Sequence, residues 1–219
     1  MSPRTSSALP FTADRVALQI DRLCFAYPQR RLFDQLSLHI GPGVSLVRGD
    51  DGSGKTTLLR LLSGDLQAQS GHLSVDAVAL HDQPLRYRQQ VFWIDVRTQA
   101  FDQVTADDYW RDVQARHAAF DPKVLSGVID GLSLAEHASK PLYMLSTGSR
   151  RKVWLAAAFA ANARLTLLDD PFAALDKPSI QFVLALLRHA AAAQHRAIVM
   201  ADYAAPPGVP VAGVIELPG

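Results

Sequence analysis

Residues 49–57 combine glycine, lysine and hydroxyl side chains at a spacing suited to binding a polyphosphate. The segment from Gly49 to Thr56 matches the pattern G-x-x-x-x-G-K-[ST] in full, between a short apolar run and a stretch of helical periodicity. Glycines let backbone N–H groups surround an anion at a helix N-terminus, while lysine neutralises the terminal phosphates and threonine ligates Mg²⁺. The candidate phosphate-binding residues are Gly49, Asp50, Gly52, Ser53, Gly54, Lys55, Thr56 and Thr57.

Two adjacent carboxylates follow a second apolar run. Residues 165–169 predict a buried strand that ends in Asp169, and Asp170 comes next. A carboxylate at the end of such a strand, beside a phosphate loop, supplies a second contact to Mg²⁺. The sequence therefore predicts a metal site formed by Thr56 and Asp169.

The elements that must position these residues alternate between strands and helices. Residues 16–40 predict two or three strands broken at Tyr27 and Pro28, and GVSLVRG predicts a buried strand that leads into the glycine-rich turn. A helix follows, with Gly64 as its C-cap. Residues 71–95 predict further short strands. Helix starts are predicted at Thr105, Asp121, the segment LSTGS (145–149) and Pro178, with strands at 165–169 and 197–202.

This alternation predicts an α/β fold with a mostly parallel sheet, since a helix between two strands favours parallel pairing. We expect a P-loop NTPase core, an N-terminal antiparallel β lobe and an inserted helical lobe at about 105–142. Residues 1–15 are predicted to be a disordered N-terminal segment and residues 16–219 one ATP-binding domain.

Composition narrows the possible partners. The 219 residues are 48% hydrophobic, which is typical of a globular protein with a sizeable core. Lys and Arg number 22 against 21 Asp and Glu, and a net charge of +1 lacks the basic footprint of a nucleic-acid binder. Cys24 is the single cysteine, so no internal disulfide is possible, which is typical of a reducing compartment such as the cytoplasm.

The order of these segments resembles that of the ABC transporter nucleotide-binding domain, from about Val16 to Leu217. The segment LSTGS is similar to the family motif LSGGQ, with Leu145, Ser146 and Gly148 retained. The resemblance implies that ATP and Mg²⁺ are bound, that this motif contacts the γ-phosphate held by another subunit, and that two subunits pair head to tail. It also implies a position next to adenine for Tyr27 and a place across the dimer interface for Asp176.

Three catalytic positions depart from the family pattern. By gapless alignment, Val96 stands where the family has a Mg²⁺-contacting Gln, and Gln99 lies three residues later. Asp170 replaces the Glu that serves as general base, one methylene shorter. Asp202 replaces the His that contacts the γ-phosphate, and His195 lies seven residues before it. With Lys55, Asp170 and Asp202 as catalytic residues, we expect MgATP binding to be retained and hydrolysis to be weakened.

The resemblance implies an ATPase subunit that works with separate transmembrane subunits, as a homodimer or heterodimer, on the inner face of the cell membrane. The short length and the run LDDPFAALD are similar to those of the small ATPases of cytochrome c maturation. Phe92, Trp93, Phe101 and Trp110 either border a groove for a membrane subunit or belong to the core. Two alternatives stay open: a regulatory ATP-binding module that dimerises without acting as a motor, and, disfavoured by charge, a soluble nucleic-acid or ribosome protein.

Overall fold

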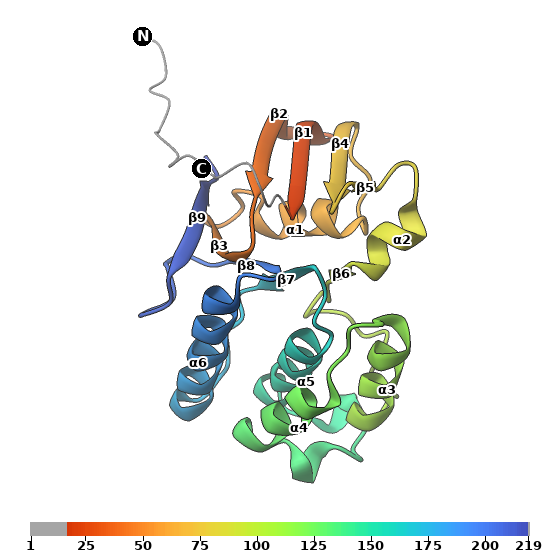
Figure 1. Ribbon diagram of the computed structural model, residues 1–219, viewed down its shortest axis with the longest axis vertical. Helices are drawn as coiled ribbons and strands as arrows, with labels where there is room; N and C mark the ends of the chain where they lie inside the picture. The colour runs from red at the N-terminus through yellow and green to blue at the C-terminus, as the bar shows by residue number, and fades with distance from the viewer. Residues whose placement is uncertain (1–16, 219) are drawn as a thin grey trace.

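The computed structural model describes residues 17–218. The N-terminal segment that the sequence predicts to be disordered lies outside these described residues. Figure 1 shows a layer of strands packed above the parallel sheet, and helices on the opposite side of that sheet. None of the helices in the described range is both long enough and apolar enough to span a membrane.

The first sheet is antiparallel and has the strand order β2-β1-β4-β5. Its strands are β1 (Leu18–Tyr27), β2 (Arg30–Ile40), β4 (Ser70–Val75) and β5 (Val78–Ala79). The break predicted at Tyr27 and Pro28 is the turn between β1 and β2. Apolar side chains of this sheet share one core with helix α1 (Lys55–Ser63), whose leucines at 58, 59, 61 and 62 are fully buried.

The second sheet has the order β6-β7-β8-β3-β9, and all of its pairs are parallel. Its strands are β3 (Gly43–Arg48), β6 (Val91–Phe92), β7 (Leu165–Asp169), β8 (Ala197–Ala201) and β9 (Val211–Glu216). Alternate side chains enter different cores: Val47 and Val199 pack with α1, whereas Leu46 and Met200 pack against the opposite helices. Both faces are therefore covered, which explains the unbroken apolar runs in these strands.

Helices α3 (Ala106–Arg116), α4 (Pro122–Gly131) and α5 (Thr147–Ala160) begin at the predicted segments, and α6 (Lys177–Ala193) begins one residue before the predicted Pro178. The Thr105 hydroxyl accepts from the Asp108 amide, and the Asp121 carboxylate accepts from the amides of residues 123 and 124. The short helix α2 (Pro84–Gln89) was not predicted, because its six residues lie within a stretch that predicts strands. The hydroxyl of Tyr87 anchors it to the Leu62 carbonyl at 2.7 Å.

Of the aromatic residues that could border a groove or belong to the core, Phe92 and Trp110 belong to the core. Phe92 and Trp110 are each 2% exposed, and the Trp110 indole donates to the Val153 carbonyl at 3.2 Å. Phe101 packs edge to face on Tyr109, with ring centroids 5.0 Å apart. The groove interpretation therefore does not hold for Phe92 and Trp110.

The parallel sheet brings distant segments together at its carboxyl edge. Strands β3, β7 and β8 are neighbours, with Val47 and Asp169 both in register with Ala201. The Asp202 amide donates to the Val47 carbonyl at 3.1 Å, which holds the ends of β8 and β3 together. The loops that follow these three strands carry the predicted site, as is usual for ligand sites of open α/β sheets.

Candidate functional site

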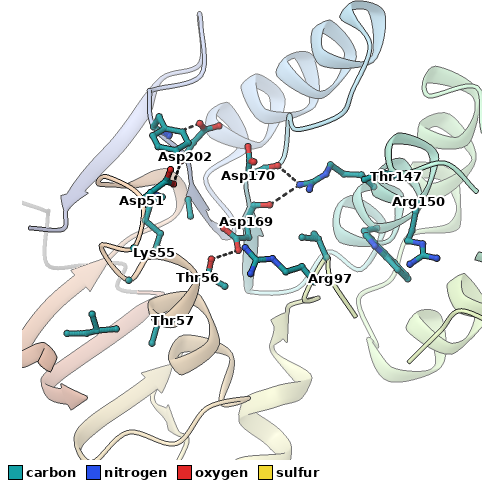
Figure 2. Close-up of a pocket in the computed structure, with 18 of the residues that line it drawn as sticks. Asp51, Lys55, Thr56, Thr57, Arg97, Thr147, Arg150, Asp169, Asp170 and Asp202 are labelled. Atoms are coloured by element: carbon teal, nitrogen blue, oxygen red, sulfur yellow. Dashed lines mark hydrogen bonds between the residues drawn. The ribbon is translucent and has the colours of Figure 1, made fainter. Parts of the chain in front are cut away.

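An open cleft of about 860 Å³ lies at this edge of the sheet. Most of the predicted site residues line it, and they come from the β1–β2 turn, the loop before α1, and the ends of β7 and β8. The residues predicted from sequence that line the cleft are Tyr27, Gly52, Gly54, Lys55, Thr56, Thr57, Asp169, Asp170 and Asp202. Figure 2 shows the charged groups converging there.

The loop 49–54 has the backbone that a phosphate cradle requires. Gly52 and Gly54 have φ values of 75° and 103°, a left-handed region that favours glycine. Gly54 is the N-cap of α1, so the amides of the first helical turn are directed out of the helix end. Ser53 is 3% exposed and its hydroxyl has no partner in the described structure. These features fit a bound anion.

The Lys55 ammonium folds back over this loop. Its Nζ donates to the Gly49 carbonyl at 2.6 Å and to the Asp50 carbonyl at 3.0 Å. It also lies 4.5 Å from the centre of the Tyr203 ring, whose hydroxyl donates to the Asp51 carboxylate. The Lys55 ammonium is thus held over the glycine-rich loop.

The predicted metal ligands are in direct contact. The Thr56 hydroxyl donates to Oδ2 of Asp169 at 2.6 Å. Burial raises the pKa of the Asp169 carboxyl, while the Thr56 hydrogen bond and the charge of Arg97 oppose that rise. Mg²⁺ characteristically takes one or two protein ligands and completes its shell with phosphate oxygens and water, so this hydroxyl and carboxylate pair suits it.

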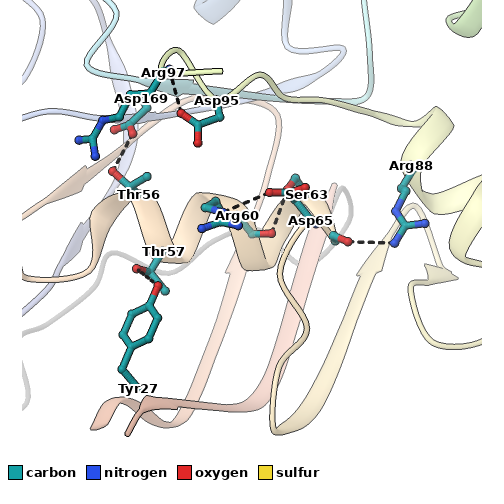
Figure 3. A network of polar contacts seen from close by, with 11 residues as sticks. Tyr27, Thr56, Thr57, Arg60, Ser63, Asp65, Arg88, Asp95, Arg97 and Asp169 are labelled. Carbon is teal, nitrogen blue, oxygen red and sulfur yellow. Dashed lines mark hydrogen bonds and ion pairs between the residues drawn. The ribbon is translucent and has the colours of Figure 1, made fainter. Parts of the chain in front are cut away.

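Tyr27 stands at the other end of the cleft. Its side chain is 44% exposed, its ring packs edge to face on Phe25, and its hydroxyl lies 3.4 Å from the Thr57 hydroxyl (Figure 3). An exposed ring fixed on two sides can accept a flat base on its free face. The position agrees with the predicted contact to adenine, which stays a prediction.

Val96, Asp170 and Asp202, the three positions that depart from the family pattern, all line the cleft. Asp170 has a φ of 46°, and its amide donates to the Ala201 carbonyl at 2.9 Å. The Asp202 carboxylate accepts from the Tyr203 amide at 2.7 Å. Burial raises the pKa of the Asp202 carboxyl, and the nearby negative charge of Asp170 adds to the rise. Two carboxylates therefore place negative charge close together in the cleft.

The residues predicted to act on a second subunit lie outside the cleft. Ser146 caps α5 by accepting from the Ser149 amide at 3.1 Å. Asp176 caps α6 and pairs with Lys152 at 2.7 Å, which lowers the pKa of its carboxyl. Gly148 approaches the Ala174 carbonyl so closely that a Cβ atom would overlap it. None of these three residues lines the cleft.

Several residues that line the cleft were not singled out from the sequence, and four of them contact the predicted site residues or are directed toward them. Arg30 donates to the Gly52 carbonyl at 3.0 Å, Tyr203 covers Lys55, Arg97 is directed toward Asp169, and Arg151 donates to the carbonyls of Asp169 and Asp170. None belongs to a motif of fixed spacing. Arg151 follows LSTGS closely in the sequence, but its targets lie 18 and 19 residues away and depend on the packing of α5.

Arg151 holds the backbone that presents both carboxylates, so its loss is expected to destabilise the fold. Arg151→Met keeps the aliphatic stem but leaves two carbonyls without their donor, and we expect it to reduce the unfolding free energy by about 2 kcal/mol. Urea unfolding measures this. The control is Arg111→Met, because Arg111 is 71% exposed and only pairs with Asp108 within α3; a change below about 0.5 kcal/mol is expected there. Equal stability of the two variants would contradict the role of Arg151.

Comparison with known proteins agrees with this geometry. Residues 33–173 match the protein family described as ABC transporter. The cytochrome c biogenesis ATP-binding export protein CcmA of Pseudomonas syringae pv. syringae (strain B728a) is 34% identical over 167 residues, which cover 75% of this chain and 78% of that protein. The ATP-dependent lipid A-core flippase of Chromobacterium violaceum is 34% identical over 200 residues, covering 84% of this chain and 33% of the flippase.

Solved structures show the same fold. One described as the ATP binding subunit of an ABC transporter superposes with a TM-score of 0.75 at 19% identity, over 84% of this chain and 79% of that one. The predicted P-loop α/β fold is confirmed by this likeness. Together with the phosphate loop, the Thr56 and Asp169 pair and the LSTGS segment, these matches show that the chain belongs to the ABC transporter family, as an ATP-binding subunit.

Proposed function

We propose that this chain binds MgATP at a head-to-tail dimer interface, hydrolyses it slowly, and couples these steps to separate transmembrane subunits from the inner face of the membrane. The observation that carries the proposal is the division of its functional groups. Lys55, Thr56 and Asp169 meet in one cleft, whereas Ser146 and Gly148 do not line it, although their neighbours Leu145 and Thr147 do. A second copy or a related subunit would bring its cleft to these residues.

The proposed roles follow from position. Gly52, Gly54 and Lys55 hold the phosphates, Thr56 and Asp169 hold Mg²⁺, which neutralises phosphate charge when bound, and the Tyr27 ring supports the base. Asp170 orients and deprotonates the attacking water. The side chain of Asp170 is one methylene shorter than that of glutamate, and Asp202 adds negative charge where the γ-phosphate would lie. The site therefore supports ATP binding better than ATP hydrolysis.

Members of this family are generally ATPases, and the relatives above are named for export and for lipid flipping. We propose that the transmembrane subunits export or flip the cargo, and that this subunit does not bind the cargo itself. The alternative function is a regulatory ATP-binding module, favoured by the three altered catalytic positions. Phosphate release by the purified chain separates the two, since a module that only binds releases none above the uncatalysed rate.

The dimer is tested by Gly148→Ala. A methyl group at this position would overlap the Ala174 carbonyl, and Ala174 itself has a φ of 60°, so the start of α5 must move away from the loop 171–176. We expect ATP-dependent dimerisation to weaken at least about tenfold while ATP binding by the monomer stays within about twofold. Sedimentation velocity with and without ATP measures the first, and fluorescent-nucleotide titration measures the second.

The matched control is Gly127→Ala in α4, because a Cβ atom there meets nothing within 4 Å. This variant should dimerise like the wild type and gain up to about 1 kcal/mol of stability from its higher helix propensity. A wild type that remains monomeric when saturated with ATP would refute pairing with itself. Equal dimerisation by both variants would refute the role of the LSTGS segment.

A further inference from the structure

The turn after β6 directs an arginine toward the predicted metal pair. The Asp95 carboxylate accepts from the Arg97 amide at 2.9 Å, and the Asp95 carbonyl accepts from the Thr98 amide at 2.9 Å, so the backbone on both sides of Arg97 is fixed. Arg97 lines the same cleft as Thr56 and Asp169. Figures 2 and 3 show its side chain extended toward the Asp169 carboxylate, which the Thr56 hydroxyl contacts from the other side.

We propose that Arg97 is a phosphate-binding residue that makes nucleotide binding by this site less dependent on Mg²⁺. The inference rests on the proposed function, because it assumes that the cleft takes ATP. It assigns a role to Arg97, a residue that was not among the site residues predicted from the sequence, although the nearby Val96 and Gln99 were considered. Val96 has no atom that ligates a metal, and its side chain packs partly into the core beneath the cleft.

The chemistry of arginine supports this role. A guanidinium presents a planar set of donors that pairs with two oxygens of a carboxylate or a phosphate at once, and it stays charged at any physiological pH. Arg97 lines the same cleft as Thr56 and Asp169, the pair that would hold Mg²⁺, so its guanidinium can approach a phosphate bound in that cleft. It therefore supplies fixed positive charge where the ion supplies it, and the two repel one another.

The charges around the cleft point the same way. The lining residues include five cationic side chains, at Arg30, Lys55, Arg97, Arg150 and Arg151, against four carboxylates, at Asp51, Asp169, Asp170 and Asp202. Among the described residues, no group of three His, Cys, Asp or Glu side chains is placed to hold a metal. Cationic side chains thus exceed carboxylates by one in this lining, and they can neutralise phosphate charge directly.

The test is ATP affinity with and without metal, measured by calorimetry on the full chain. Titrations in Mg²⁺ and in excess EDTA are compared for the wild type, Arg97→Gln and the control Arg111→Gln, whose arginine lies on α3 outside the cleft. For the wild type and the control we expect the dissociation constant in EDTA to stay within about tenfold of that in Mg²⁺. In EDTA, Arg97→Gln should bind ATP at least about tenfold more weakly than the wild type does in EDTA. In Mg²⁺, its affinity for ATP should be unchanged or improved relative to the wild type.

Each other outcome overturns a different statement. If the wild type loses ATP in EDTA as completely as Arg97→Gln does, or if Arg97→Gln is indistinguishable from the wild type in both titrations, the role of Arg97 is wrong and the ATP site stands. If the wild type binds ATP under neither condition, the proposed function fails, and the role of Arg97 fails with it. Urea unfolding of both variants confirms that any loss is not a loss of folding.

Discussion

Asp170→Glu is expected to raise the rate of ATP hydrolysis by roughly 100-fold. The aspartate carboxylate falls about one ångström short of the position that glutamate reaches, and a displacement of that size costs on the order of 100-fold in rate. The backbone of the loop is already held in place, since the Asp170 amide bonds to the Ala201 carbonyl and its own carbonyl accepts from Arg151. The added methylene therefore extends into the open cleft rather than into the core.

Adding Asp202→His should raise the rate further, by about tenfold. The Asp202 carboxylate lines the cleft near Lys55 and Asp170. In its charged form this carboxylate would repel a phosphate that enters the cleft. Burial raises the pKa of the Asp202 carboxyl, because a partly buried position disfavours the negative charge. Imidazole replaces that charge with a hydrogen-bond donor. Phosphate release under saturating MgATP measures the single and double variants beside the wild type.

The control for length and backbone strain is Asp170→Gln. Position 170 has a φ of 46°, a conformation that aspartate adopts more readily than longer side chains, so Glu and Gln share the same cost in stability. Gln cannot accept a proton and should leave the rate at or below that of the wild type. A wild-type turnover already within about 1–1000 s⁻¹, unchanged by Asp170→Glu, would contradict the weakened site.

Lys55→Ala is expected to weaken MgATP binding by about 10- to 100-fold and to abolish the remaining hydrolysis. Charge-assisted bonds to phosphate are worth about 1.5–3 kcal/mol, and Lys55 is the cation directly above the glycine loop. The same contacts to the Gly49 and Asp50 carbonyls stabilise the empty loop, so a modest loss of stability is also expected. Nucleotide titration and phosphate release measure the two functional effects.

Lys123→Ala is the matched control, since Lys123 is exposed in the first turn of α4 and lies outside the cleft. It should bind and hydrolyse ATP like the wild type. Unfolding curves of both variants separate a binding defect from a folding defect. Undiminished ATP affinity in folded Lys55→Ala would show that the cleft is not the nucleotide site.

Local pattern accounts for much of the fold that was predicted. The strands β3, β7 and β8 were predicted from short apolar runs, and the caps Thr105, Asp121 and Ser146 marked the starts of α3, α4 and α5. These signals depend on residues within a few positions of one another. The helix α2 was missed because its six residues lie within a stretch that predicts strands, and the hydrogen bond that anchors it joins Tyr87 to a carbonyl 25 residues away.

The sequence by itself predicted the glycine-rich loop and the Asp169 carboxylate, because each depends on residue type and spacing along a few neighbouring positions. The resemblance to the family pattern added the departures at 170 and 202. Only the tertiary structure decided which charges surround them. Arg151 reaches Asp169 and Asp170 through the packing of α5, Tyr203 covers Lys55 from the end of β8, and Arg97 approaches Asp169 from a turn after β6. Such contacts join segments up to 148 positions apart in the chain, and no local periodicity encodes the direction of a long side chain across that separation.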